Sequence, residues 1–402
     1  MATPKQKLIL RICCGAHVIH DGAVDMLYAL LPLLREAFGL TYAEVALVRS
    51  VHRFATALFE IPIGILAEKL GARNLLVAGT VLVGIAFLGL GFANGFAAIL
   101  AFIFLAGCGA AVQHPLSSSI ISNAFPGAGQ RAALGTYNAL GDVGKFTFLG
   151  LTLLATTVFG FSWQVPVHGF IIVAALFAVS IFTFLTLANA DERLGLSSKH
   201  DLADTVKSWG IKHQRGFYTL GTIAALDSST RSGFLTFVAF LMIEKGVATE
   251  LAATAVLATV FGGMCGKYAV GLIAERIGVA RTIILTEIAT AGLIILVILL
   301  PSVAAFFLLP LLGMFLNGTS SAIYGSVADL IEGEKHSRAY ALIYTLGSAC
   351  GLVAPLLYGL LADSSSVTTA LVFVAIVVLL TVPLCGTLAT ALSEAKGNAL
   401  DV

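Results

Sequence analysis

The octapeptide GILAEKLG at Gly64–Gly71 recurs in the second half of the chain as GLIAERIG at Gly271–Gly278. Both glycines, the alanine and the glutamate are identical, and the other four positions change conservatively. The same offset (64 to 271) also relates Gly39 to Gly246, Arg131 to Arg338 and Tyr137 to Tyr344. Four registrations at one offset indicate that the chain consists of two related halves.

The composition predicts an integral membrane protein. Hydrophobic residues make up 58% of the 402 residues and charged residues only 11%, and the mean hydropathy is +0.97. Soluble domains carry about 25% charged residues. The net charge of +1 shows no basic surplus, so we expect no nucleic-acid partner.

About 20 apolar residues are needed to cross a bilayer, and glycine, proline and charged breaks divide the chain into twelve such spans. We predict them at 9–34, 43–67, 74–94, 97–122, 132–159, 164–188, 216–243, 249–274, 281–300, 303–328, 338–361 and 367–391. The longest polar stretch lies between the sixth and seventh. We therefore expect a six-helix bundle at 1–188, a cytoplasmic linker at 189–214 and a second bundle at 215–402.

The distribution of lysine and arginine predicts the orientation of these spans. If the N-terminus is inside, the outside loops hold only Arg35 and Lys245, and the other loop cations lie inside. Because cytoplasmic loops are enriched in lysine and arginine, we expect both termini in the cytoplasm. Two halves in parallel repeat, related by an axis along the membrane normal, are typical of one transporter architecture.

The repeated octapeptides fall in two predicted cytoplasmic loops, after spans 2 and 8. Their first glycines are expected to allow close helix approach, and their glutamates to cap a neighbouring helix or pair with a nearby arginine. Such pairs would form a cytoplasmic latch that holds one conformation shut. The alternative is a charged loop that only obeys the positive-inside rule. The predicted latch comprises Gly64, Glu68, Gly71 and Arg73, and Gly271, Glu275, Gly278 and Arg281.

The first of these sets resembles the glycine–acid–glycine–arginine signature of the major facilitator superfamily. The second resembles its weaker copy, with one extra residue before the arginine. Within the superfamily, fosmidomycin-resistance-type exporters are the closest likeness. The stretches that carry it are AHVIHDGAVDMLYALLPLL (16–34), GCGAAVQHPLSSS (107–119) and GLLAD (359–363). Leu116 and Ser119 depart from that family's pattern, which has an acid and a base there.

This resemblance implies an all-α membrane fold of twelve transmembrane helices, in two six-helix bundles in parallel repeat. Spans 1, 4, 7 and 10 would then line a central cavity. Their polar residues would face it, and span 10 would contribute Asn317 and Tyr324.

Charged side chains inside spans are functional candidates, because burying them in lipid is costly. We identify the acids Asp21, Asp25, Glu60, Asp142 and Asp227 and the bases Arg49, Arg53, Lys145, Arg231 and Lys267. Five acids and five bases suggest internal pairing. Asp142 and Lys145 are spaced i, i+3, and Asp227 and Arg231 i, i+4, so each can also be a simple local pair.

The first span places His17, Asp21 and Asp25 on one helix face, at i, i+4 and i+8. Two carboxylates one turn apart repel, which favours proton binding by one of them. We predict proton coupling by Asp21, Asp25, Arg49 and Arg53. The predicted substrate-binding residues are His17, His20, Tyr28, His114, Asp142, Lys145, Asp227, Arg231, Asn317 and Tyr324.

The sequence therefore favours a secondary active transporter that exports a small organic compound in exchange for protons by alternating access. One alternative is proton-coupled uptake of an organic anion, with Arg49, Arg53 and Arg231 as counter-charges. Another is a metal transporter or intramembrane enzyme that uses His17, His20, Asp21 and His114.

We do not expect an enzyme, a resident metal or a cofactor, and no GxxxxGK[ST] signature for ATP appears. The expected partners are a small-molecule substrate, protons and the lipid bilayer. The expected form is a monomer that spans a bacterial inner (plasma) membrane several times.

Overall fold

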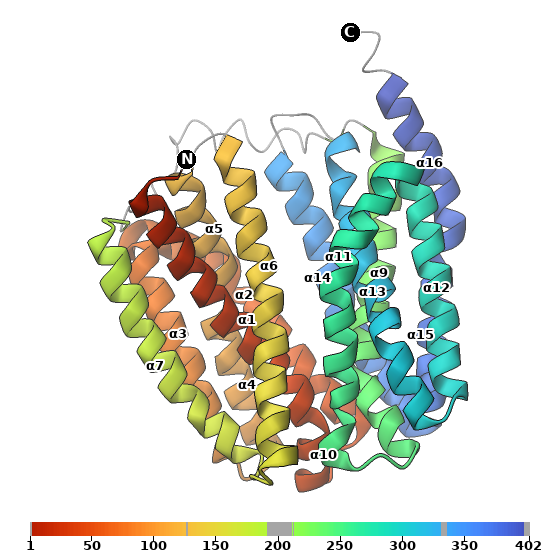
Figure 1. The fold of residues 1–402 in the computed structure, drawn as a ribbon, viewed down its shortest axis with the longest axis horizontal. Coiled ribbons are helices and arrows are strands. Elements are labelled where there is room, and N and C mark those ends of the chain that lie inside the picture. Colours follow the sequence, from red (N-terminus) through yellow and green to blue (C-terminus); the bar gives the residue numbers. More distant parts are fainter. Residues whose placement is uncertain (1, 126–127, 191–210, 212, 331–335, 398–402) are drawn as a thin grey trace. The chain divides into compact units, whose positions relative to one another are not determined.

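The protein is described by a computed structural model that covers residues 2–125, 128–190, 211, 213–330 and 336–397. Within these ranges it is built from helices (Figure 1). The first half contains α1 (Pro4–Phe38), α2 (Tyr42–Leu70), α3 (Ala72–Gly91), α4 (Phe96–Ala110), α5 (Gln113–Ala124), α6 (Ala128–Leu153), the π-helical turn η1 (Leu154–Val158) and α7 (Gln164–Leu187). The second half contains α9 (Gln214–Glu244), α10 (Thr249–Ala252), α11 (Thr254–Ile277), α12 (Val279–Leu299), α13 (Ser302–Gly325), the 3₁₀ turn η2 (Val327–Leu330), α14 (His336–Ser364), α15 (Val367–Leu379) and α16 (Thr381–Gly397).

Each predicted span coincides with a helix or with two consecutive helices, so the all-α prediction is confirmed. The span predicted at 97–122 is divided between α4 and α5, just before the His114–Pro115 pair. The span at 367–391 is divided between α15 and α16, just before Pro383. Proline lacks a backbone donor and crowds the preceding turn, so a break before it is the expected outcome.

Within the described residues, ten segments are long and apolar enough to cross a membrane. Neither α1 nor α9 is among them, although they have 35 and 31 residues. These two helices carry His17, Asp21, Asp25, Asp227 and Arg231, and these polar residues lower their mean hydropathy. The two long helices that are not apolar enough, α1 and α9, are thus helices in which the sequence analysis predicted functional residues.

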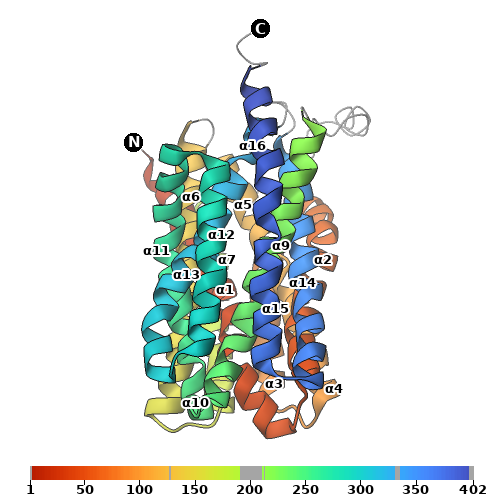
Figure 2. The ribbon, with the colours of Figure 1, turned by 90° about the vertical axis from the view of Figure 1, so that its right-hand side faces the viewer.

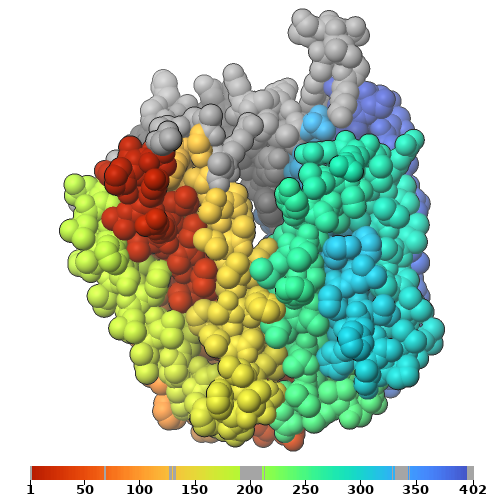
Figure 3. Space-filling view, viewed as in Figure 1, coloured from red at the N-terminus to blue at the C-terminus, as the bar shows by residue number. Residues whose placement is uncertain are grey.

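The chain divides into two compact units, each described here by itself. Unit 1 comprises 1–40 and 47–199, and unit 2 comprises 41–46 and 200–402. In unit 1, α1 packs along α6, and α3 packs between α4 and α7. On the face seen in Figure 3, α1 and α6 lie side by side. An added Cβ at Gly144 of α6 would collide with the Val18 backbone of α1, so glycine permits this close approach.

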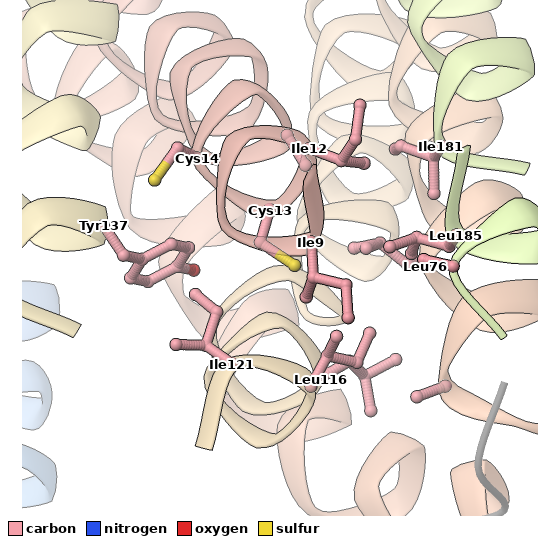
Figure 4. Close-up of a cluster of buried hydrophobic side chains, with 14 of the residues drawn as sticks. Ile9, Ile12, Cys13, Cys14, Leu76, Leu116, Ile121, Tyr137, Ile181 and Leu185 are labelled. Carbon is pink, nitrogen blue, oxygen red and sulfur yellow. The ribbon is translucent and has the colours of Figure 1, made fainter. Parts of the chain in front are cut away.

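A buried apolar cluster joins α1, α2, α3, α5, α6 and α7 of unit 1 at the end where α1 begins (Figure 4). It includes Cys13 of α1, Leu76 of α3, Leu116 of α5, Tyr137 of α6 and Ile181 of α7. Cys13 and Leu76 are fully buried and Tyr137 is only 1% exposed. The cluster fixes the first turns of α1 against α5 and α6, just before the polar residues of α1.

Unit 2 is held together by close packing of α11 on α13 and of α9 on α14 (Figure 2). Added Cβ atoms at Gly262, Gly266 and Gly313 would collide with backbone atoms of the facing helix in the α11–α13 pair. Small residues let membrane helices approach to backbone contact. The first turn of α2 belongs to unit 2, where the Asp363 carboxylate accepts hydrogen bonds from the Tyr42 and Ala43 amides at 2.7 and 2.9 Å. Asp363 thus satisfies two amides that a helix N-terminus leaves unpaired.

The repeat is visible in the backbone conformation of its glycines. Gly71 has φ 84° and Gly278 has φ 88°, and each lies directly between two helices. Gly39 and Gly246, another predicted pair, have φ 63° and 83°. Both related positions therefore need the left-handed region that only glycine enters readily. The other two matches of the repeat stay predictions, because the described part does not include the side chains of Arg131, Arg338 and Tyr344.

The expected role of the first glycine in each octapeptide is wrong. An added Cβ at Gly64 would meet no atom within 4 Å, and at Gly271 only the Ser321 Cβ at 4.0 Å. These glycines do not bring helices into close contact. It is the last glycine of each copy, Gly71 or Gly278, that the turn requires.

The latch pairs are only partly described. The Glu68 side chain lies outside the described part of the chain. Arg73 donates to the Thr186 hydroxyl at 2.9 Å and lies 5.1 Å from the Phe182 ring centroid, which ties α3 to α7. Glu275 and Arg281 are exposed, and their predicted ion pair is absent from this structure.

We expect Gly71→Ala and Gly278→Ala each to destabilise the protein by about 1–3 kcal/mol, because alanine is strained at these backbone angles. Gly64→Ala and Gly271→Ala are matched controls, since both positions are helical and open. Thermal unfolding of the detergent-purified protein measures the effect. Equal losses in all four variants would contradict this account of the turns.

Candidate functional site

The Asp21 carboxylate lies at the centre of a polar cluster in unit 1, the Asp21 cluster (His17, Asp21, His114, Asp142 and Lys145). Its Oδ2 lies 3.2 Å from the Lys145 Nζ of α6 and 3.2 Å from His17 Nε2. Its Oδ1 lies 3.7 Å from His114 Nε2 of α5. Three helices therefore supply the groups around one carboxylate. The cluster fits because α6 has glycine at 141, where a Cβ would lie 2.6 Å from His17 Nε2.

The tautomer of His17 is fixed by its surroundings. Its Nδ1 lies 2.8 Å from the Tyr137 carbonyl oxygen, so Nδ1 must carry a proton and donate. The ring also stacks on the Tyr137 ring, with centroids 4.0 Å apart. A neutral His17 then presents the Nε2 lone pair to the Asp21 carboxylate. Nε2 has no hydrogen-bond partner of good alignment, and the contact at 3.2 Å is favourable only with a proton on one of the two groups.

Lys145 is shared between two carboxylates. Its Nζ lies 3.2 Å from Asp142 Oδ1 as well as 3.2 Å from Asp21 Oδ2. The i, i+3 pair predicted for Asp142 and Lys145 is present, but the sequence did not predict the contact between Lys145 and Asp21. The side chains of Lys145 and His114 are 29% and 52% exposed, whereas that of Asp21 is 13% exposed. A solute can therefore reach two basic groups whose partner is a largely buried acid.

His17, Asp21 and His114 are the only set of three histidine, cysteine or acidic side chains, within the described residues, whose ligand atoms lie close enough for a metal ion. The donor set does not fit one well. A metal at Asp21 would lie beside the Lys145 ammonium, and the Nδ1 of His17 is already committed to Tyr137. A cation would have to displace a permanent positive charge, so the geometry favours proton chemistry here.

Asp25 forms a separate buried pair with Arg49 of α2, as the sequence predicted. Arg49 donates to Asp25 Oδ1 at 3.3 Å and to the Val24 carbonyl at 2.8 Å. Its guanidinium also lies over the Tyr28 ring, 4.3 Å from the centroid. Arg53 acts on Asp25 electrostatically. Arg49 is only 2% exposed, so this pair is not presented to a solute.

The predicted substrate role of His20 is not supported by its position. Its Nε2 bonds the Thr80 hydroxyl of α3 at 2.9 Å. Because the Thr80 hydroxyl donates to the Leu76 carbonyl, Nε2 is the donor to Thr80. His20 is 2% exposed. We therefore assign it to packing between α1 and α3.

Unit 2 holds the other predicted site residues. Arg231 donates to Asp227 Oδ2 at 3.0 Å, so the predicted i, i+4 pair on α9 is present. Asn317 donates to the Gly313 carbonyl of its own helix at 3.3 Å and packs on Gly263 of α11. Tyr324 of α13 is partly buried.

The sequence analysis counted five acids and five bases within the predicted spans. That equality is wrong, because the count omitted Glu287. This residue lies in the predicted span 281–300, in the middle of α12, and is 1% exposed. The signal was present in the sequence as a single acid in TEIAT, Thr286 to Thr290.

The fold and the site define a multi-pass membrane transporter. The chain belongs to the Major Facilitator Superfamily, whose family model matches residues 13–315 and 220–397. It is therefore a transporter of small molecules and not an enzyme. A crystal structure of a bacterial homologue of the human lysosomal transporter Spinster is similar over 98% of this chain and 99% of that one, with a TM-score of 0.76 and 15% identity.

Curated relatives match over most of their length. The MFS-type transporter YfnC of Bacillus subtilis is 24% identical over 92% of this chain and 89% of its own. The hexuronate transporter of the same organism is 22% identical over 83% of this chain and 82% of its own. The fosmidomycin resistance protein of Escherichia coli is 29% identical, but over only 28% of each chain. The resemblance to fosmidomycin exporters is thus local, and other transporters match more of the chain.

We expect Asp25→Asn to destabilise the protein by about 3–5 kcal/mol, because it leaves the Arg49 charge buried without its partner. Asp142→Asn is the matched control, since Lys145 keeps Asp21 and is partly exposed. Thermal unfolding in detergent measures both variants. An Asp25→Asn protein as stable as the wild type would show that the pair does not support the fold.

Proposed function

We propose that this protein couples the transport of a small organic anion to protons through the Asp21 cluster. The observation that carries the proposal is the position of Lys145, which is partly exposed and held by Asp21 and Asp142 at 3.2 Å each. An ammonium group binds a carboxylate or phosphate. The adjacent imidazole of His114 adds a second donor at the exposed side of the cluster.

The shared lysine sets the sign of the coupling. When Asp21 binds a proton, it no longer holds Lys145 by charge, and the ammonium becomes available to an anion. When the anion binds Lys145, Asp21 loses a stabilising cation and binds its proton more tightly. Linkage requires these two effects to be equal. Proton and anion therefore promote each other's binding, which is the requirement for symport.

The relatives support an anionic substrate. The hexuronate transporter carries a sugar acid by its name and matches most of this chain. An inward proton gradient across a bacterial inner membrane, with both termini cytoplasmic, then drives uptake. Asp21 and Asp25 with Arg49 and Arg53 remain the proposed proton-coupling groups. Glu68 and Arg73 remain the proposed latch, whereas its second copy lacks the ion pair between Glu275 and Arg281 in this structure.

Proton-driven export is the second candidate, and the local likeness to the fosmidomycin resistance protein favours it. Export by antiport requires proton and substrate to compete. The present cluster gives that outcome for a cationic substrate, which would bind Asp21 in place of Lys145. The sign of the linkage between substrate and proton therefore separates the two candidates.

We expect Asp21→Asn to lose accumulation driven by a proton gradient while keeping exchange of anion across the membrane. The amide resembles the protonated acid and leaves Lys145 available, so anion binding should also become independent of pH. Uptake and counterflow of labelled hexuronate in proteoliposomes are the measurements. Gradient-driven accumulation at the wild-type level would remove Asp21 from the coupling mechanism.

We expect Lys145→Gln to weaken anion binding at least tenfold, equivalent to about 1.4 kcal/mol, because it removes the exposed cation. Lys69→Gln, at the exposed end of α2, is the control for a general change in charge. Binding is measured by titration of the purified protein. Unchanged affinity in Lys145→Gln would contradict the placement of the anion.

A further inference from the structure

Unit 2 contains a second group of buried charges, away from the α1 residues that the proposed function uses. Asp227 and Arg231 lie one turn apart on α9, joined at 3.0 Å. Glu287 on α12 interacts electrostatically with both. Asp227 and Glu287 are 3% and 1% exposed. Two carboxylates therefore share the influence of one guanidinium in an apolar interior.

Glu287 is not satisfied by the protein around it. Its Oε1 is buried and has no hydrogen-bond partner. The Thr290 hydroxyl, one turn further along α12, is also buried without a partner. A buried polar atom without a partner costs free energy, so its presence in a folded protein calls for an explanation. Both of these unpartnered atoms belong to α12. The three ionised side chains of the group, Asp227, Arg231 and Glu287, together carry a net charge of minus one.

The other elements packed on α12 supply no second cation in the described residues. From α16, Cys385 interacts electrostatically with Glu287. No titratable residue occurs in α15, and α13 contributes only Tyr324. Lys267, Glu275 and Arg276 of α11 do not act on Glu287, whose electrostatic partners are Asp227 and Arg231. Within the described residues, Arg231 is thus the only cation among the electrostatic partners of Glu287.

We infer that Glu287 is a second proton-binding site, whose occupancy is controlled by the Asp227–Arg231 pair. A proton neutralises the excess charge and turns Glu287 into a donor as well as an acceptor. A metal ion would need several convergent oxygen ligands. The only described cluster of three candidate ligand residues is the one at Asp21. The proton therefore fits this site better.

The position of Arg231 suggests how the site enters the transport cycle. Its side chain is 22% exposed, whereas that of Asp227 is 4% exposed, so an anion can reach the guanidinium. An anion at Arg231 would offset the positive charge near Glu287 and strengthen proton binding there. This last step rests on the proposed function, whereas proton binding by Glu287 does not.

Infrared spectroscopy of the purified full-length protein tests the inference, because a protonated carboxylic acid has its own C=O stretching band. We expect such a band at neutral pH that disappears in Glu287→Gln and persists in Asp21→Asn. Asp227→Asn should also remove it at neutral pH, since Glu287 then becomes the only anion beside Arg231. In that variant the band should return as the pH is lowered.

Three results would overturn the inference. One is the absence of any Glu287-dependent band from mildly acidic to mildly alkaline pH. Another is a band that Asp227→Asn leaves unchanged, which would indicate an acid that is permanently protonated for packing alone. The third is loss of the band when sodium chloride replaces choline chloride, which would indicate a cation site. None of these outcomes depends on transport. Failure of this inference can therefore be distinguished from failure of the proposed coupling role of Asp21.

Discussion

The central constraint on this protein is the cost of holding the Asp21 carboxylate inside an apolar bundle. Unpaired, it would oppose membrane insertion by a few kcal/mol. The bundle compensates with Lys145 Nζ at 3.2 Å, His17 Nε2 at 3.2 Å and His114 Nε2 at 3.7 Å. Gly141 leaves the room that these groups need. The packing of α1 against α5 and α6 therefore has to be accurate, and the apolar cluster around Cys13 and Tyr137 provides that accuracy.

The two units treat their buried charges differently. In unit 1, Asp21, Asp25 and Asp142 each have a base at 3.3 Å or closer, and Lys145 is shared by Asp21 and Asp142. In unit 2, Asp227 pairs with Arg231 on α9 and the more exposed His213 pairs with Glu394, whereas Glu287 retains an oxygen without a hydrogen-bond partner. The proton exchange that we propose at Asp21 and at Glu287 rests on these two arrangements. The internal repeat duplicates the helices and their glycine turns, but it does not duplicate these charges.

The sequence predicts the helices well because apolar runs of span length permit few other structures in a membrane. It also predicts contacts within one helix, such as Asp142 with Lys145 and Asp227 with Arg231, because helical periodicity fixes those distances. Contacts between helices depend on rotation and depth, which periodicity does not supply. Hence the contact between Asp21 and Lys145 was not predicted, and His20 was assigned to a site when it bonds Thr80.

Two corrections concern the roles of residues whose type and spacing can be read directly from the sequence. Gly64 and Gly71 look equivalent in the octapeptide, yet only Gly71 has a positive φ, and Gly64 faces open space. Glu287 stands alone in a long apolar run, but its importance follows from its burial and from its oxygen without a hydrogen-bond partner. In both cases residue type and spacing were visible, whereas backbone conformation and burial decided the role.

The most direct test of the account is the number of protons that the purified protein takes up when it binds an organic anion. The measurement uses a weakly buffered solution with a pH indicator, titrated with hexuronate as the probe anion, and Lys145→Gln as the control. The account predicts uptake of protons on binding, because the anion at Lys145 strengthens proton binding by Asp21. Release of protons, or binding of the anion without any change in pH, would contradict it.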